Sequence, residues 1–198
     1  MIVSVNVALP APLLTAKGEV LSGVRKLPAS GRVAVRRLGL AGDGQGNPEI
    51  HGGPDKAVYV YSIDHYAPWS RELGRSDLAP GIFGENLTVE GMLETEVKIG
   101  DIYRAGTAFL QVTQPRAPCF KLVARMGLPD FQKTFLASGR VGFYCRVLEE
   151  GDVAAGDAVE RISTPPDALT VLQDARRLWG EVAAGRVPPS GARIANTS

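Results

Sequence analysis

The stretch QPRAPCFKL contains Cys119, one of only two cysteines in the chain. Pro115 and Pro118 precede the thiol, with Arg116 between them and Lys121 just after it. A helix is expected to begin directly after Cys119, and both a helix start and nearby positive charges favour thiolate over thiol. The prolines restrict the backbone and so fix the direction of the sulfur. The residues alone leave two alternatives open: a packed loop that contains a thiol, or a reactive or ligating cysteine.

The second cysteine, Cys145, lies in the stretch RVGFYCRVL, whose alternation of apolar residues is typical of a strand. It shares this alternation with Val141, Phe143 and Val147, so its side chain is expected on the apolar face. Free cysteine is commonly a small buried apolar residue. Cys145 is therefore interpreted as part of the core.

The stretch GDGQGNPEIHGGPDKAVYVYS, residues 42–62, could bind an anion. Gly52 and Gly53 leave backbone N–H groups approachable, as in loops that hold phosphate. His51 precedes them and Lys56 follows. The stretch is neither a Walker loop nor a G-x-G-x-x-G dinucleotide fingerprint. The alternative is a glycine-rich connection between strands in which His51 makes a structural hydrogen bond.

The stretch PGIFGENLTVEG contains Asn86, which could orient a ligand or cap a turn, and the local residues do not decide between these roles.

A Cys–His protease or amidase is a further alternative. There His51 would be the base for Cys119, and Asn86 or Asp55 would orient the base. The chain contains no nucleophile motif of that class, which disfavours this interpretation.

Short β-branched and aromatic runs separated by turn residues predict the elements that must position these side chains. The chain contains 23 glycines and 14 prolines, spread along its length. Many short strands with turns every eight to twelve residues predict a barrel or a sandwich. Short helices are expected over residues 63–73, where Pro68 interrupts or restarts the helix, and over residues 120–126 and 129–137.

A change in composition after Ile162 divides the chain. The stretch STPPDALTVLQDARRLWG predicts a Pro-Pro joint, an Asp167 cap and a helix to about Trp179. We therefore predict a β domain over residues 1–163 and a short helical tail over residues 164–198 that is too short to fold alone.

The composition and the spacing of residues argue against several classes of protein. The chain has 22 basic and 21 acidic residues, a net charge of +1, which argues against a nucleic-acid partner. No apolar run reaches the roughly eighteen residues that cross a bilayer, so no membrane partner is expected. The first lysine is Lys17, which disfavours a signal peptide and predicts a cytoplasmic protein without disulfides. The two histidines and two cysteines match no zinc spacing.

Five separated segments, in order along the chain, resemble the MOSC family, the proteins similar to the C-terminal domain of molybdenum cofactor sulfurase. They are HGGPDKAVYVYS, GIFGENLTVEG, the IGD of residues 99–101, QPRAPCFKL, and RVGFYCRVLEEG followed four residues later by GD. The resemblance covers roughly residues 1–162 and is closest to the stand-alone bacterial branch.

The resemblance implies a mainly β fold: a MOSC-type β-barrel with a few short peripheral helices and a short helical C-terminal tail. It implies that Cys119 ligates the molybdenum of a pterin-dithiolene cofactor, Mo-molybdopterin, or carries a persulfide. It makes Cys119 the catalytic and metal-binding residue. The residues expected to bind the cofactor and its phosphate are Cys119, Arg116, His51, Gly52, Gly53, Lys56 and Asn86.

The resemblance also implies an activity, the reductive removal of oxygen from small N-hydroxylated compounds such as hydroxylaminopurines and amidoximes. A separate flavoprotein would supply the electrons, since the chain has no flavin or nicotinamide motif, and no role for pyridoxal phosphate is expected. The alternatives are a carrier of the cofactor or of persulfide sulfur, without turnover, and a structural β domain that binds a partner. A homodimer stays open. Relatives of this branch often continue into a three-helix domain, so the single C-terminal helix is interpreted as a truncated version of it.

Overall fold

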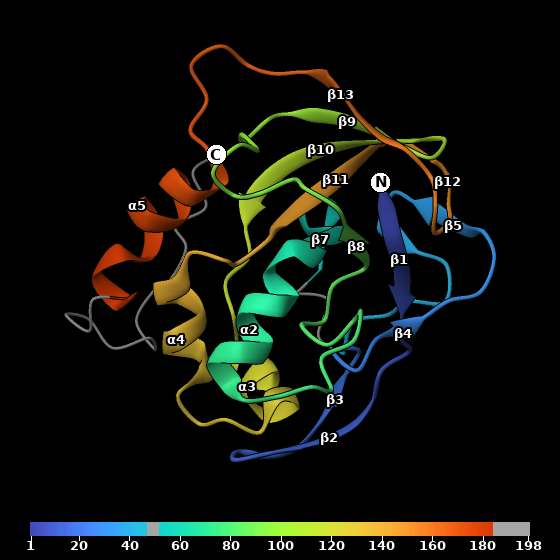
Figure 1. Ribbon diagram of the computed structural model, residues 1–198. Helices are drawn as coiled ribbons and strands as arrows, with labels where there is room; N and C mark the ends of the chain where they lie inside the picture. Colours follow the sequence, from blue (N-terminus) through green and yellow to red (C-terminus); the bar gives the residue numbers. More distant parts are fainter. Residues whose placement is uncertain (47–51, 184–198) are drawn as a thin grey trace.

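The computed structural model describes residues 1–46 and 52–183 (Figure 1). Within these residues, strands in three sheets form most of the regular structure, and short helices lie against them. The helices are η1 (Pro54–Lys56), η2 (Ile63–His65), α2 (Tyr66–Leu73), α3 (Phe120–Met126), α4 (Phe131–Ser138) and α5 (Val171–Ala183). The predicted mainly β class with a few helices is confirmed.

The largest sheet has eight strands, of which only β7 and β8 pair in parallel. Their order across the sheet is β13 (Val159–Ser163), β9 (Ile102–Ala105), β10 (Ala108–Pro115), β11 (Phe143–Glu149), β7 (Val58–Ser62), β8 (Leu87–Val89), β1 (Ile2–Val7) and β4 (Leu27–Pro28). The two small antiparallel sheets are β12 (Gly151–Val153) with β5 (Val33–Arg36) and β6 (Gly39–Leu40), and β2 (Ala11–Thr15) with β3 (Gly18–Ser22).

The predicted barrel is not closed by strand pairing. Across residues 1–46 and 52–183, β13 and β4 are the edges of the large sheet, and no ladder joins them. Two backbone hydrogen bonds of 2.8 Å instead connect Ile2 with the turn at Gly156 and Asp157, just before β13. β1, the neighbour of the edge strand β4, is therefore joined to the turn before β13 by these two bonds rather than by a ladder of paired strands.

Alternation along β7 divides the interior into two cores. Val58 and Val60 pack in a core made mainly of sheet residues, whereas Tyr59 and Tyr61 pack in a second core with aromatic side chains of α2 and α4 and aliphatic side chains of α3. Cys145 belongs to the first core, is 2% exposed, and burial raises the pKa of its thiol. Its interpretation as a core residue is confirmed.

The three short helices before the tail occur close to where the sequence predicts them. Pro68 lies in the first turn of α2, where a missing N–H costs nothing, so it starts this helix rather than breaking it. Cys119 is the N-cap of α3. Gly127 and Gly139 end α3 and α4 with a φ of 71°, a left-handed conformation that suits glycine.

The C-terminal helix begins later than predicted. Thr170, not Asp167, precedes α5: its hydroxyl accepts the Gln173 amide at 3.2 Å, and the Gln173 side chain accepts the Thr170 amide at 2.8 Å. This reciprocal pair is a capping box, which outcompetes the isolated aspartate. Ala175 and Trp179 of α5 pack in the second core. The division of the chain at residue 163 stays a prediction.

Candidate functional site

A cavity lies where β10 ends and the chain enters α3. Its wall consists of residues from three segments, 22–26, 43–46 and 116–121, together with Lys56, Tyr59, Gly84, Asn86 and Tyr144. The first two segments touch backbone to backbone: a Cβ on Gly23 would lie 2.1 Å from the Gly44 carbonyl oxygen. Residues distant in sequence therefore form one continuous wall, and it includes Cys119.

Cys119 is positioned by the two elements that it joins. β10 ends at Pro115, the chain turns, and α3 begins at Phe120, with the Cys119 carbonyl accepting the Leu122 amide at 2.9 Å. The residue is partly exposed and lines the cavity. The described residues contain no group of three or more His, Cys, Asp and Glu side chains that could hold a metal ion. Among the described residues, the cavity therefore offers a metal one thiolate, that of Cys119.

Arg116 lies in the cavity wall and is only 5% exposed. Its guanidinium carbon lies 5.0 Å from the centre of the Tyr59 ring and 5.5 Å from that of Phe135, and the Tyr144 hydroxyl is a neighbour. Its Nη1 atom is buried and has no hydrogen-bond partner within the described residues. A buried guanidinium nitrogen without a partner carries a desolvation cost, which an anion in the cavity would offset.

Lys26 and Asp43 form an ion pair in the cavity wall. Burial lowers the pKa of Lys26, and the charge of Asp43 opposes this effect. Asp43 also accepts the Ala8 amide at 2.9 Å. This pair was not predictable from the sequence, because nothing local in VRKLP distinguishes Lys26 from a surface lysine.

The side chain of Asn86 is fully used inside the protein. Its amide nitrogen donates to Asp43 at 2.9 Å and to the Asn6 carbonyl at 3.3 Å, while its oxygen accepts the Tyr59 amide at 3.1 Å. Asn86 lines the cavity, but the observed contacts make it the residue that orients Asp43. Direct binding of a cofactor by Asn86 stays a prediction.

Positive charge exceeds negative charge in the cavity wall. Of the described residues, four cationic side chains line it, those of Lys26, Lys56, Arg116 and Lys121, together with one carboxylate, that of Asp43. Lys121 is buried, and its ammonium group makes no hydrogen bond or ion pair with any residue of segments 1–46 and 52–183. The cavity is thus suited to a small anion even though the whole chain is nearly neutral.

The structure brings together four of the predicted site residues: Cys119, Arg116, Lys56 and Asn86 line one cavity. Gly52 and Gly53 are not among its lining residues. Gly53 precedes η1 with a φ of 91° and lines a neighbouring hollow that shares Asp43, Gly44 and Gln45 with the cavity. His51 lies outside the described residues.

The Cys–His alternative gains no support from the residues proposed to orient its base. The Asp55 carboxylate pairs with Arg146 at 2.8 Å, and the Asn86 amide is committed to Asp43. Both partners are thus engaged elsewhere.

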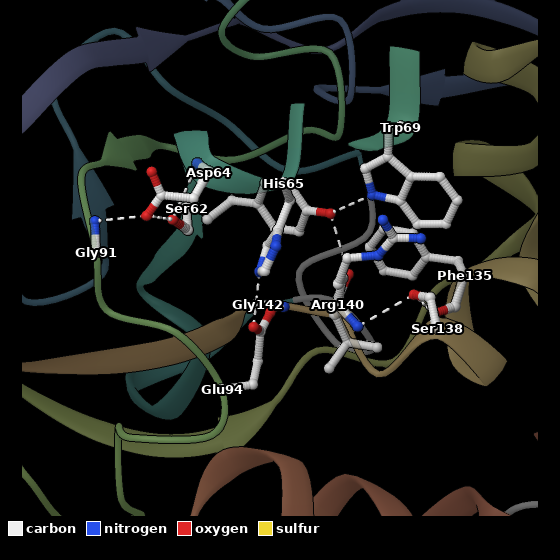
Figure 2. Close-up of polar contacts among 12 residues, drawn as sticks. Ser62, Asp64, His65, Trp69, Gly91, Glu94, Phe135, Ser138, Arg140 and Gly142 are labelled. Carbon is white, nitrogen blue, oxygen red and sulfur yellow. Dashed lines mark hydrogen bonds and ion pairs between the residues drawn. The ribbon is translucent and has the colours of Figure 1, made fainter. Parts of the chain in front are cut away.

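The other histidine, His65, supports the site indirectly, through Glu94 and Gly142. His65 Nε2 lies 2.7 Å from Glu94 Oε2, and the second Glu94 oxygen accepts the Gly142 amide at 2.7 Å (Figure 2). The Gly142 carbonyl in turn accepts the Arg116 amide at 3.2 Å. A buried pair outside the cavity therefore fixes the backbone that carries Arg116.

Glu85 explains why the stretch GIFGENL folds as it does. One oxygen of its fully buried carboxylate accepts the Tyr66 hydroxyl, the Gly81 amide at 2.7 Å and the Thr88 hydroxyl at 2.9 Å. The other oxygen accepts the Phe83 amide at 3.1 Å. Burial raises the pKa of Glu85, and these donors oppose the rise. Glu85 is thus a structural residue that shapes the loop beside the cavity.

Glu85→Gln is expected to lower the free energy of unfolding by about 1–3 kcal/mol. The NH2 group of the new glutamine would face the Phe83 N–H and could not accept the hydrogen bond that this N–H now donates to the carboxylate. Chemical denaturation measures this loss. Glu90→Gln, at an exposed position, is the control and should change stability by less than about 0.5 kcal/mol. Equal stabilities of the two variants would contradict the role of Glu85.

The model of the MOSC domain matches residues 47–160, more than half of the chain, and the protein belongs to this family. The resemblance in its five segments is thereby confirmed. None of the described helices has the length and apolar character needed to cross a membrane.

Among individual proteins, the chain is 41% identical over 170 residues to the uncharacterized protein YflK of Bacillus subtilis, covering 86% of this chain and 76% of that protein. It is 38% identical over 161 residues to YiiM of Escherichia coli, covering 80% and 71%. A protein of Gibberella moniliformis named "Reductase" is 37% identical over 158 residues, which are 78% of this chain but only 28% of that protein. The crystal structure of YiiM from Geobacillus stearothermophilus matches with a TM-score of 0.76 and 35% identity, over 94% of this chain and 89% of that one.

Proposed function

We propose that the protein is a molybdenum-cofactor-dependent reductase of small N-hydroxylated compounds. The observation that carries the proposal is the pairing, in one cavity, of the Cys119 thiol with a buried guanidinium whose Nη1 has no described partner. Membership of the MOSC family supports the cofactor, and a fungal relative named "Reductase" supports the class of reaction.

The residues of the cavity fit the proposed cofactor. Its metal needs one soft protein ligand beside its dithiolene sulfurs, and Cys119 is the cysteine that the cavity offers. Its phosphate needs hydrogen-bond donors and positive charge, which the free Nη1 of Arg116 and the buried Lys121 can supply. Lys56 lies in the same wall. Gly52, Gly53 and His51 stay in the proposed binding set as predictions from the family resemblance, outside the described lining of the cavity.

When bound, the cofactor supplies two-electron redox chemistry suited to removing oxygen from an N–OH group. The overall reaction consumes two electrons and two protons and yields the amine and water. Lys26 carries a proton at Nζ within the cavity, and burial lowers the pKa of this ammonium group, which makes it a better proton donor. Asp43 fixes the ammonium group, so we assign Lys26 as the proton donor to the leaving oxygen. The electrons come from a separate flavoprotein.

Turnover with a small chemical reductant tests the function without the natural donor. Protein loaded with the molybdenum cofactor is mixed with reduced methyl viologen and either an amidoxime or an N-hydroxylated purine. One amine is expected for each two electrons consumed. A loaded protein that yields no amine from either substrate would overturn the reductase and would favour a carrier of the cofactor.

A further inference from the structure

The outer side of the cavity wall carries arginine side chains. Within the segment 22–27, Lys26 is buried and lines the cavity, whereas its neighbours Arg25 and Leu27 are exposed, Leu27 to 67%. Arg25 is thus flanked by two residues that line the cavity, Val24 and Lys26, so a protein bound at Arg25 would contact the segment that forms part of the cavity wall.

The helix that carries Cys119 leads to the same surface. α3 begins after Cys119 and has Arg125 in its last turn. Its seven residues span about 10 Å. Nη1 of Arg75, in the loop after α2, donates to the Met126 carbonyl at 3.0 Å and so joins that loop to the end of α3. Arg75 and Arg125 therefore lie at the same helix end, one short helix away from the thiol.

Like charges are crowded in this arginine patch, which we define as Arg25, Arg75 and Arg125. Burial lowers the pKa of the Arg125 guanidinium, and the positive charges of Arg25 and Arg75 lower it further. Arg125 Nε is buried without a hydrogen-bond partner among the described residues. Asp77 binds Arg75 through two bonds of 2.8 and 2.7 Å and is the exposed carboxylate of the group. Besides Asp77, only the buried carboxylate of Glu85 acts on Arg125 with the opposite charge among the described residues, so an acidic partner at the surface would relieve the repulsion.

We propose that the arginine patch is the docking site for the acidic face of the flavoprotein that delivers electrons to the cavity. The inference rests on the proposed function, because only a reductase without its own flavin needs such a partner. Opposite charges steer two proteins into an encounter and fix their orientation. Docking at the patch would place the donor beside both elements, the segment 22–27 and α3, that separate it from Cys119.

Binding to a flavodoxin, a small acidic FMN protein, tests the patch without any cofactor in the cavity. At low ionic strength, Arg125→Glu and Arg25→Glu are each expected to raise the Kd of flavodoxin by about tenfold or more, because each replaces attraction with repulsion. At about 0.3 M salt the difference should largely vanish, since exposed charges are then screened within a few ångströms. Arg176→Glu, on the exposed side of α5, makes the same charge change away from the patch and should leave the Kd unchanged.

Turnover separates this inference from the function on which it rests. With reduced viologen, the Arg125→Glu protein should match the wild type, whereas with reduced flavodoxin its rate should fall about tenfold. An unchanged Kd in both patch variants would overturn the docking site, as would tighter binding of the wild type to a DNA duplex than to flavodoxin. Salt-dependent binding without viologen-driven turnover would instead overturn the reductase and leave the patch as a surface for acidic proteins.

Discussion

Cys119→Ala is expected to reduce turnover of N-hydroxylated substrates by more than about a hundredfold, even with a small chemical reductant. Mutation of a residue that hydrogen-bonds to a metal ligand typically lowers metal affinity or activity tenfold to a hundredfold. Loss of the ligand itself should lower activity at least as much. Stability should change by less than about 0.5 kcal/mol, because the thiol is partly exposed and the N-cap contact to α3 uses the Cys119 carbonyl. Steady-state kinetics and chemical denaturation of the purified variant measure the two effects.

Cys145→Ala is the matched control, because it removes the other sulfur of the chain. Cys145 is buried in the first core, so this variant should lose about 1 kcal/mol of stability yet keep its turnover per folded molecule. The two variants should thus show opposite patterns, one in activity and one in stability. Equal turnover in the two variants would contradict a catalytic role for Cys119.

Arg116→Met is expected to have opposite effects on the empty and on the loaded protein. The free energy of unfolding of the empty protein should rise by about 1 kcal/mol or more, because the variant removes a buried charge that forms no ion pair within the described residues. Methionine would still pack against Tyr59 and Phe135, the rings that the guanidinium now covers. The loaded protein should bind its cofactor about tenfold to a hundredfold more weakly, the usual value of a hydrogen bond to a charged group.

Thermal unfolding with and without cofactor measures both effects of Arg116→Met. The shift in Tm caused by the cofactor should shrink in the variant, since ligand stabilisation depends on affinity. Arg140→Met is the control: Arg140 lies 3.9 Å from the centre of the Trp69 ring and pairs with Glu72, outside the cavity. It should lower the Tm of both forms equally. A large loss of stability in the empty Arg116→Met protein would show that Arg116 is structural rather than poised for an anion.

Local signals predicted the parts of the site that depend on neighbours in sequence. Cys119 at the start of α3 followed from the helix periodicity after it and from Gly127 as its end. Cys145 in the core followed from strand alternation, which holds wherever one face of a strand is buried. Arg116 was expected near Cys119 because the two are three residues apart, and both line the same cavity.

Features that depend on distant segments were not predictable from local sequence. The pairing of Lys26 with Asp43 requires the close backbone approach at Gly23 and Gly44, which only the tertiary structure reveals. The hydrogen bonds of the Asn86 side chain to Asn6 and Tyr59 also depend on distant segments, because they require β8 to run beside β1 and β7. Closure of the sheet depends on segments at opposite ends of the chain, so strand propensity could suggest a barrel but could not establish one.

X-ray absorption at the molybdenum edge tests the central claim, that Cys119 in this cavity is the protein ligand of the cofactor. Wild-type and Cys119→Ser proteins are produced side by side in a host that makes the cofactor. The wild type should contain molybdenum with one more sulfur neighbour than the dithiolene supplies. The variant should contain no metal, or metal with one sulfur neighbour fewer than the wild type. A Cys119→Ser protein with full metal content and an unchanged number of sulfur neighbours would contradict the assignment.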